Sequence, residues 1–374
     1  MPVAVNFGLR EELMKVVPTL SLCYQCGTCS TNCPITDDSF NIRLIIKKSQ
    51  LGAVDPRDFK VIWDCVTCGT CQSLCPTGVE ITNVIEMLRT LAVKSKVFPT
   101  KINEILWKIY ENQNPWGYTA TDKRRFLAQF GNLINNENPD VLIYPCCLSI
   151  GDPRVTRHIK ALIRILTKAG LKVGMYTGLT CCGDIISHTG NKAFYEEYTT
   201  KVRDALMQYK APIIVTLSPH CEYSLKRYVK GVRVVHYVEL LKELIDSGKL
   251  KLDGKKVDVK VTYHDPCYLA KHQGVIEEPR QIIRSIPGVK LIEMEHSGKR
   301  ALCCGAGGGG IALETRVSTE LSKRRLKEAL DTGASIMLTA CTYCFRMFED
   351  ANKVMRTNIK IMDLAEFIDS VLGD

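Results

Sequence analysis

Two cysteine runs near the N-terminus have a spacing that could hold metal clusters. They are Cys23-x2-Cys26-x2-Cys29-x3-Cys33-Pro34 and Cys65-x2-Cys68-x2-Cys71-x3-Cys75-Pro76. This spacing is typical of chains that bind two 4Fe-4S clusters, in which the fourth cysteine of each run binds the cluster of the other run. The sequence therefore predicts one cubane cluster on Cys23, Cys26, Cys29 and Cys75, and a second on Cys65, Cys68, Cys71 and Cys33.

Structural zinc and a disulfide framework are the alternatives. Neither explains a four-cysteine run that ends in Cys-Pro and occurs twice. The other cysteines also lie in motifs, at Cys146-Cys147, Cys181-Cys182, Cys221, Cys267, Cys303-Cys304 and Cys341-x2-Cys344. The N-terminus lacks the pattern of a signal peptide, so we expect a reducing cytoplasm in which thiols can serve as ligands.

The segments beside the two runs have helical periodicity. Ile42, Ile45 and Ile46 share one face before Gly52, and apolar residues recur at helical spacing over residues 81–92. We therefore predict an α-helical ferredoxin domain over residues 1–95. Residues 96–140 are expected to form a linker with one amphipathic helix, and we expect Trp107 on this helix to pack into a core rather than against a membrane.

From Val141 onward the sequence repeats itself with a period near 120 residues. The repeat aligns Val141–Tyr144 with Val261–His264, Cys147 with Cys267, Cys181-Cys182-Gly183 with Cys303-Cys304-Gly305, and Ser218-x2-Cys221 with Cys341-x2-Cys344. We predict a first Cys-Cys-Gly domain over residues 141–253 and a second over residues 254–374.

Each copy alternates short β-branched runs with helical patterns, which indicates a parallel α/β architecture. The predicted fold class is α/β, with the N-terminal α-helical ferredoxin domain followed by two tandem α/β Cys-Cys-Gly domains. In each copy the cysteines follow predicted strand ends. Because the carboxyl ends of parallel strands face one crevice, cysteines far apart in the sequence should converge there.

The second copy offers five thiols to one site: Cys267, Cys303, Cys304, Cys341 and Cys344. A structural zinc ion takes four ligands, and both side chains of an adjacent pair can turn to one small ion only with difficulty. Two adjacent thiolates suit a core of several iron atoms better.

The order of these motifs resembles that of a known enzyme family, heterodisulfide reductase. Residues 1–95 resemble its C-type ferredoxin chain, residues 141–374 resemble its B-type chain with Cys-Cys-Gly domains, and the whole sequence is similar to the fused D-type chain. The resemblance implies that Cys267, Cys303, Cys304, Cys341 and Cys344 hold a noncubane four-iron cluster, where a disulfide such as that of coenzymes M and B is reduced or formed. It also implies that the two ferredoxin clusters exchange electrons with this site one at a time.

The first copy departs from the family pattern, because Ser218 stands where the second copy has Cys341. Its candidate ligands are Cys147, Cys181, Cys182 and Cys221, with Cys146 and His220 nearby. A serine hydroxyl rarely ionises to compete with thiolate for iron. We therefore expect an asymmetry, in which the first site holds less iron than the second, a zinc ion or nothing.

His264 lies three residues before Cys267. Disulfide cleavage delivers protons to the departing thiols, so His264 is a candidate proton donor, and a histidine that only shapes the turn is the alternative. His188 and Lys271 are weaker candidates of the same kind. The run Gly305-x-Gly307-x2-Gly310 follows a cysteine pair rather than a strand, so we expect it to admit backbone close to a cluster and not to bind a dinucleotide.

Composition narrows the possible partners. The formal net charge of +10 counts every cysteine as neutral, and thiolate ligands would reduce it, while no interleaving of aromatic and basic residues suggests nucleic-acid binding. No apolar stretch reaches the ~18 residues of a membrane helix. We expect a cytoplasmic protein whose membrane contact, if any, is peripheral and made through a partner subunit.

Two functions fit these observations. The first is the iron-sulfur catalytic subunit of a heterodisulfide-reductase-like complex, which acts on a small-molecule disulfide, thiol or related sulfur substrate. The second is the electron-transfer subunit of a flavin-dependent glycerol-3-phosphate, glycolate or lactate dehydrogenase that passes electrons to quinone. Since the sequence has no evident flavin site, both require a partner, expected to be a flavoprotein or a membrane-bound cytochrome b.

Overall fold

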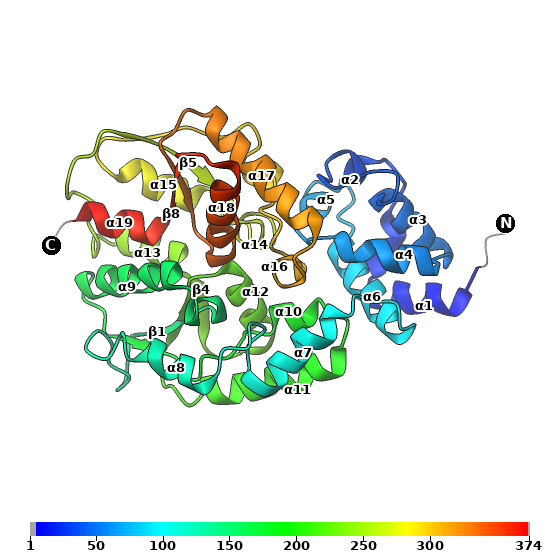
Figure 1. Ribbon diagram of the computed structural model, residues 1–374, viewed down its shortest axis with the longest axis horizontal. Coiled ribbons are helices and arrows are strands. Elements are labelled where there is room, and N and C mark those ends of the chain that lie inside the picture. The colour runs from blue at the N-terminus through cyan, green and yellow to red at the C-terminus, as the bar shows by residue number, and fades with distance from the viewer. Residues whose placement is uncertain (1–4, 373–374) are drawn as a thin grey trace.

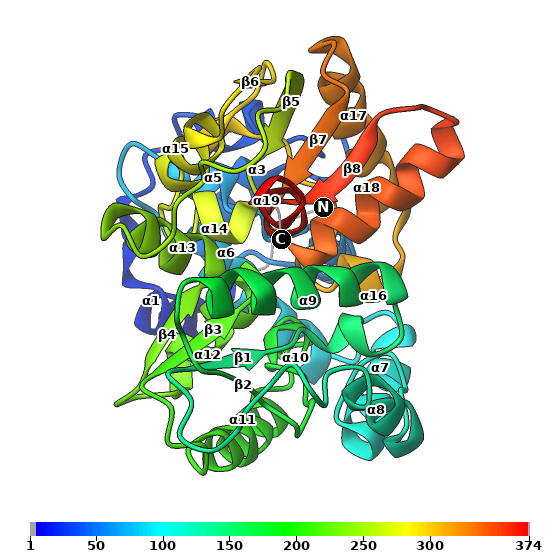
Figure 2. The same cartoon turned by 90° about the vertical axis from the view of Figure 1, so that its left-hand side faces the viewer.

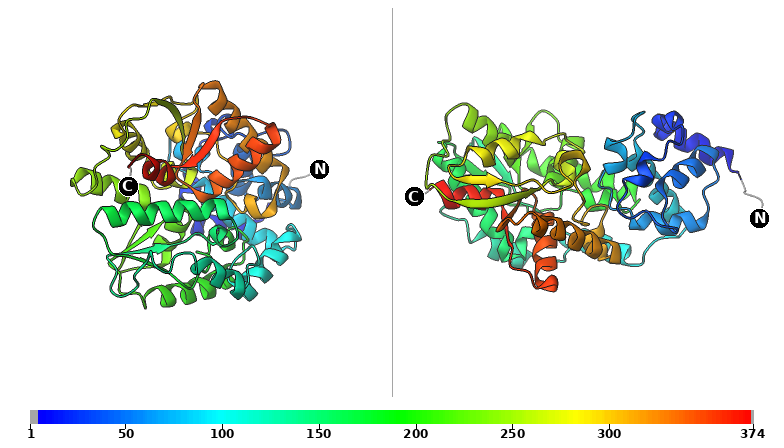
Figure 3. Two further views of the ribbon diagram at one scale, coloured as in Figure 1. Left: turned by 60° about the vertical axis from the view of Figure 1, so that its left-hand side comes forward. Right: turned by 90° about the horizontal axis from the view of Figure 1, so that it is seen from above.

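The computed structural model describes residues 5–372, which form an elongated molecule with a helical domain at one end and two α/β domains at the other (Figures 1 and 3). The helical domain contains α1 (Phe7–Val16), η1 (Pro18–Leu22), α2 (Thr28–Thr31), α3 (Ile42–Leu51), α4 (Pro56–Val61), η2 (Ile62–Asp64), α5 (Thr70–Ser73) and α6 (Ile81–Lys94). Its core is a separate apolar cluster that includes Leu13, Ile45, Ile85 and Leu88.

The two cysteine runs adopt similar local structures. In each run a glycine with positive φ, Gly27 at 88° and Gly69 at 73°, precedes a one-turn helix, α2 or α5. Glycine tolerates this backbone conformation because it has no Cβ atom. The two short helices pack against each other, which brings the two runs together.

Residues 96–140 contain two helices, α7 (Lys101–Asn112) and α8 (Ala120–Leu127). α7 buries Ile102, Ile105 and Ile109, while Trp107 lies on its opposite face, is 60% exposed and stacks on Tyr110. The expectation that Trp107 packs into a core is therefore wrong, because its position on the helix points away from the buried isoleucines.

The two α/β domains contain the same four-stranded parallel sheet. The first has β1 (Val141–Tyr144), β2 (Val173–Met175), β3 (Ile213–Thr216) and β4 (Arg233–His236) in the order β2-β1-β3-β4; the second has β5 (Val259–His264), β6 (Val289–Leu291), β7 (Ile336–Thr339) and β8 (Lys360–Asp363) in the order β6-β5-β7-β8. The equivalent order confirms the predicted duplication and the α/β class of this half of the chain.

Helices connect the strands and cover the sheets. In the first domain they are η3 (Cys147–Ile150), α9 (Pro153–Lys168), α10 (Asp184–Ser187), α11 (Lys192–Leu206), α12 (Pro219–Tyr228) and α13 (Tyr237–Asp246). In the second they are α14 (Cys267–Ala270), α15 (Glu277–Ser285), η4 (Gly298–Arg300), α16 (Gly310–Leu313), α17 (Arg316–Asp331), α18 (Thr342–Met355) and α19 (Leu364–Leu372).

The last helix of each α/β domain packs on the other domain. α13 packs on α15 and α19 packs on α9, so the two domains exchange equivalent helices across their interface (Figure 2). One apolar cluster contains Leu241 of α13, Ile283 of α15, Leu162 of α9 and Ile368 of α19. This shared core fixes the orientation of the two sheets and of the sites at their ends.

Among residues 5–372, no helix combines the length and the apolar character that crossing a membrane requires.

Candidate iron-sulfur sites and their junction

The first ferredoxin site combines cysteines of both runs. Cys23, Cys26, Cys29 and Cys75 line one cavity, together with Tyr24 and Arg43. Cys75 belongs to the second run, so this arrangement agrees with the predicted exchange of the fourth cysteine. Cys26 is exposed, which places this site at the surface of the helical domain.

The second ferredoxin site is less exposed than the first: Cys68 is buried, and Cys33, Cys65 and Cys71 are partly buried. Burial, followed by the neighbouring thiols of Cys68, Cys65 and Cys33, raises the pKa of Cys71 well above its ordinary value. Burial also raises the pKa of Cys65 to about 12. Cys33 of the first run thus lies beside the first three cysteines of the second run, as the exchange requires.

The second Cys-Cys-Gly site brings its five predicted thiols together. Cys344 Sγ lies 3.2 Å from Cys304 Sγ and Cys267 Sγ lies 3.9 Å from Cys303 Sγ. Hydrogen bonds from Cys303 and Cys344 lower the pKa of Cys304 to about 5, and Cys341 hydrogen-bonds Cys344. All five side chains are buried at the carboxyl ends of β5 and β7, with the Cys303-Cys304 loop closing the site.

The first Cys-Cys-Gly site also contains five neighbouring thiols. Cys146 interacts with Cys147 and Cys221, Cys181 interacts with Cys147 and Cys182, and Cys182 interacts with Cys221. Cys146 thus completes a closed ring of sulfur atoms, although Ser218 offers none. The asymmetry in iron content expected from Ser218 stays a prediction, and Cys146 gives the first site as many neighbouring thiols as the second.

Backbone N–H groups point at one sulfur in each cysteine pair. Gly305 N donates to Cys303 Sγ at 3.3 Å, and Gly183 N donates to Cys181 Sγ at 3.5 Å. Such bonds favour the thiolate form that binds iron. The glycine after each pair, with φ of 90° at Gly305 and 88° at Gly183, allows this turn.

His220 lies between the two Cys-Cys-Gly sites. Its ring stacks on Tyr268 with centroids 3.9 Å apart, and its Nδ1 lies 3.1 Å from Asp184 Oδ2. Burial opposes protonation, but Asp184, then Cys341 of one site and Cys146 of the other, raise the pKa of His220 to about 9. The sequence indicates His220 only as a spare ligand of the first site.

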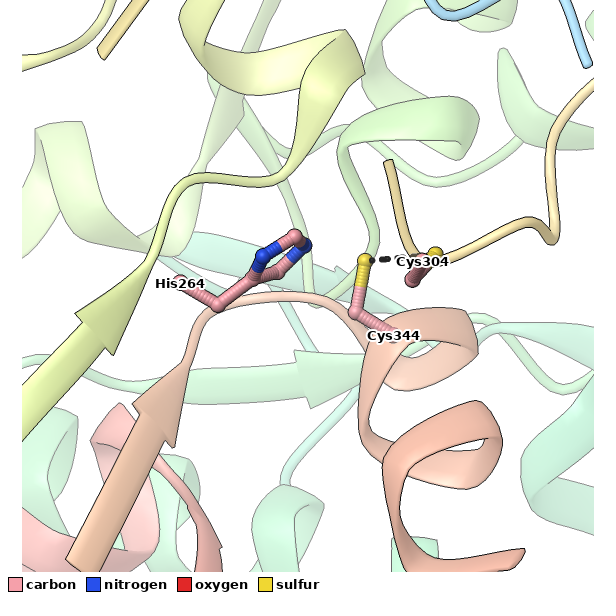
Figure 4. Close-up of side chains that lie close together, drawn as sticks. All are labelled: His264, Cys304 and Cys344. Carbon is pink, nitrogen blue, oxygen red and sulfur yellow. Dashed lines mark hydrogen bonds between the residues drawn. The ribbon is translucent and has the colours of Figure 1, made fainter. Parts of the chain in front are cut away.

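His264 faces Cys304 and Cys344, and one ring nitrogen and the two sulfur atoms all lie within 4.8 Å of one another (Figure 4). Its Nδ1 accepts a 3.1 Å hydrogen bond from Arg325 Nε, which leaves the proton of the neutral ring on Nε2. Burial and then Arg325 hold the pKa of His264 well below its ordinary value. His264 is therefore suited to donate an N–H hydrogen bond toward sulfur.

The two weaker candidates lie at the junction of the domains. His188 Nε2 is 2.8 Å from the Tyr268 hydroxyl, and Lys271 Nζ donates to Thr70 of the ferredoxin domain at 2.6 Å. The glycine run has the expected role of admitting backbone, because a Cβ atom at Gly307 or Gly308 would lie 2.3 or 2.5 Å from a carbonyl oxygen of the 65–66 loop.

Arg89 is a junction residue that sequence reasoning missed. It is fully buried on α6, and its guanidinium donates to four carbonyl oxygens, those of Ile62, Cys65, His188 and Gly308. The available signal was an arginine among the apolar repeat of residues 81–92. A charged residue in such a position is usually paired or hydrogen-bonded.

A cavity of about 420 Å³ is lined by residues of the 116–118 turn, of η3 and of α16 to α18, and by no cysteine of the two Cys-Cys-Gly sites. Its apolar wall includes Trp116, Leu148, Ile311 and Met347, and its rim includes Glu314, Lys323, Arg346 and Asp350. Trp116 packs edge-on against Tyr343, and the thiols of Cys147 and Cys146 lie near enough to Tyr343 to raise its pKa further after burial. Two aromatic side chains, Trp116 and Tyr343, thus lie between the cavity and the thiols of the first site.

The donor sets fit iron-sulfur clusters. Each ferredoxin set contains four cysteines from two runs, and each Cys-Cys-Gly set contains five buried thiols with an adjacent pair. Soft thiolate ligands select such clusters over magnesium or calcium. Five sulfur atoms also exceed the four ligands of a structural zinc ion.

The sequence matches two known domain families. The cysteine-rich domain (CCG) matches twice, over residues 132–226 and 261–349, and the 4Fe-4S dicluster domain matches over residues 19–79. The chain therefore contains one ferredoxin-type dicluster domain followed by two cysteine-rich domains.

Similar proteins are iron-sulfur oxidoreductases. The EtfAB:quinone oxidoreductase of Syntrophomonas wolfei is 28% identical over 97% of this chain, which spans 59% of that relative's length. The B-type chain of the fumarate reductase (CoM/CoB) of Methanothermobacter marburgensis is 29% identical over 98% of this chain and 75% of the relative. The D-type chain of the heterodisulfide reductase of Methanosarcina barkeri is 27% identical over 95% of this chain and 94% of the relative, which confirms the resemblance found in the sequence.

Proposed function

We propose that the protein is the iron-sulfur catalytic subunit of a heterodisulfide-reductase-like complex, which reduces or forms a small-molecule disulfide or a related sulfur bond. The observation that carries the proposal is the direct approach of the two kinds of site. Cys303 lies near enough to Cys68 of the second ferredoxin run that its thiol, together with burial, raises the pKa of Cys68 well above its ordinary value. This proximity supports electron exchange between the ferredoxin domain and the second Cys-Cys-Gly site.

When bound, the clusters would carry electrons one at a time between the surface of the helical domain and the buried thiol sites. Cys267, Cys303, Cys304, Cys341 and Cys344 would hold one cluster, and Cys146, Cys147, Cys181, Cys182 and Cys221 a second. His264 Nε2–H is available beside Cys304 and Cys344 to hydrogen-bond sulfur, since the atom has no other partner in the described part of the chain.

The cavity lined by Trp116, which packs against Tyr343, is the proposed substrate site. Its apolar wall would hold the body of an amphipathic disulfide, and the charged rim would contact polar ends.

An electron-transfer subunit without its own substrate is the second candidate. It is favoured by the similarity to a relative named as a quinone oxidoreductase, of which this chain spans only 59%. In either case we propose a flavoprotein or a membrane-bound cytochrome b as partner and a location on the cytoplasmic side of the membrane, held there through that partner.

Turnover of an added disulfide separates the two candidates. Anaerobically prepared protein, reduced by a dye, should reduce a low-molecular-weight disulfide without any flavoprotein. Cys304→Ala should abolish this turnover while the ferredoxin clusters remain reducible by dithionite in electron paramagnetic resonance spectra. Absence of disulfide turnover without a flavoprotein would favour the electron-transfer subunit, and turnover that survives Cys304→Ala would show that the second Cys-Cys-Gly site is not where the disulfide reacts.

A further inference from the structure

Lys271 connects the second Cys-Cys-Gly domain to the second ferredoxin run. It follows α14, the helix that begins at Cys267, and its half-buried ammonium donates to Thr70 Oγ1 at 2.6 Å and to the carbonyl oxygen of Ala301 at 2.6 Å. Ala301 lies two residues before Cys303. The lysine therefore joins a loop that carries a ligand of one site to a loop that carries ligands of the other.

Thr70 connects Lys271 to a ligand sulfur atom. Its Oγ1 lies 3.3 Å from Cys68 Sγ, and both residues are buried. Because Lys271 has no acceptor atom, it must donate to the threonine oxygen, which leaves the threonine proton free to point at Cys68. The positive charge of Lys271 also lowers the pKa of Cys68, against the larger effects of Cys303 and burial.

The first ferredoxin run has the threonine without the lysine. Thr28 occupies the same place in its run, and its Oγ1 lies 3.4 Å from Cys26 Sγ. Within residues 5–372, no lysine or arginine hydrogen-bonds Thr28. Cys26 is also exposed, whereas Cys68 is buried, so water screens any charge near the first run more strongly.

We propose that Lys271 acts through Thr70 to raise the reduction potential of the cluster held by the second run above that of the cluster held by the first. Hydrogen bonds to ligand sulfur and nearby charge are two of the factors that set the potential of such clusters. Lys271 is thus a positioning residue, and it directs electrons toward the cluster beside Cys303. The inference rests on the proposed two-cluster ferredoxin domain, and it does not depend on the substrate.

The test is a redox titration of anaerobic, full-length protein. Electron paramagnetic resonance spectra monitor the signals of the two ferredoxin clusters at each potential. Lys271→Met and Thr70→Val should each lower the potential of the second cluster, by about tenfold in the reduction equilibrium, which is 59 mV for a one-electron couple. Lys271→Arg keeps the positive charge and Thr70→Ser keeps the hydroxyl. Both variants should therefore keep the potential of the second cluster close to that of the unaltered protein.

Thr28→Val is the matched control, because it removes the equivalent hydroxyl where no lysine supports it. It should lower the reduction potential of the first cluster by less than Thr70→Val lowers that of the second cluster. In the double variant, Lys271→Met should lower the potential by less than it does alone, because only the direct effect of the lysine charge remains once the hydroxyl is gone.

Three outcomes would overturn the inference. They are an unchanged second potential in Lys271→Met, a full additional shift in the double variant, and equal shifts from the two threonine variants. If the potentials shift as expected but the unaltered protein turns over no disulfide, the result would count against the proposed function and not against the role of Lys271. Absence of a second ferredoxin cluster signal would overturn both.

Discussion

At the scale of single residues, the first Cys-Cys-Gly site depends on a cysteine outside the family pattern. Cys146 closes the sulfur ring that Ser218 leaves open, because it precedes Cys147 and turns its thiol toward Cys221. Ser218 is buried, and its hydroxyl has no hydrogen-bond partner among the described residues. Cys146 is therefore the residue whose loss should matter at this site.

Cys146→Ser should remove the fifth thiolate and reduce the iron and sulfide bound by the protein, while the second site keeps its own. Serine is a poor ligand because its hydroxyl rarely ionises. Ser218→Ala is the control and should leave the metal content unchanged. The measurement is the iron and sulfide content per chain of anaerobically purified variants. Equal contents in Cys146→Ser and the unaltered protein would show that Cys146 is no ligand.

His264 offers a second test at this scale. His264→Leu removes the N–H group beside Cys304 and Cys344, and loss of such a supporting group typically costs about 10–100-fold in activity or metal affinity. His264→Gln can keep an N–H at the position of Nε2 and should retain most of the activity. Disulfide turnover per bound iron is the measurement. If both variants behaved alike, His264 would only fill space in the turn.

At the scale of elements, α6 connects all three domains through Arg89. Its guanidinium donates to carbonyl oxygens of the ferredoxin domain, of the loop after α10 and of the glycine run. Buried carbonyl groups that lose such a donor remain unsatisfied unless water replaces it. Arg89 therefore joins all three domains at one point of the junction, in addition to the contact that Lys271 makes with Thr70.

Arg89→Met should lower the free energy of unfolding by about 3 kcal/mol or more, because several buried carbonyl oxygens lose their donors. Arg57→Ala is the control, since its side chain is 89% exposed. Such a surface change is expected to stay within about 0.5 kcal/mol. The measurement is anaerobic unfolding of both variants in denaturant. Equal free energies of unfolding would show that Arg89 does not stabilise the junction.

The elements were predictable where a local pattern determines them. The cysteine spacing, the helical periodicity of residues 81–92 and the repeat from Val141 predicted the helical domain, the parallel sheets and the thiols of the second site. The exchange of α13 and α19 could not be predicted, because an apolar helix face does not say which domain covers it. For the same reason the proximity of Cys68 to Cys303 and the place of Cys146 required the tertiary structure.

At the scale of the whole molecule, the ferredoxin sites differ in exposure because of how the domains join. The first site lies at the surface of the helical domain, where Cys26 is exposed. The second site is covered by the glycine run of the second Cys-Cys-Gly domain, and Gly307 and Gly308 approach the 65–66 loop closely. The domain junction should therefore protect one cluster and leave the other accessible.

An iron chelator should remove the cluster of the first run several times faster than that of the second, as followed by the decay of their two paramagnetic signals. Gly307→Ala should abolish this difference, because the new Cβ atom would lie 2.3 Å from the carbonyl oxygen of Val66 and must push the covering loop away. Gly131→Ala, whose Cβ atom would meet no atom within 4 Å, is the matched control and should keep the slow phase. Equal decay of both signals in the unaltered protein would mean that the junction does not shield the second site.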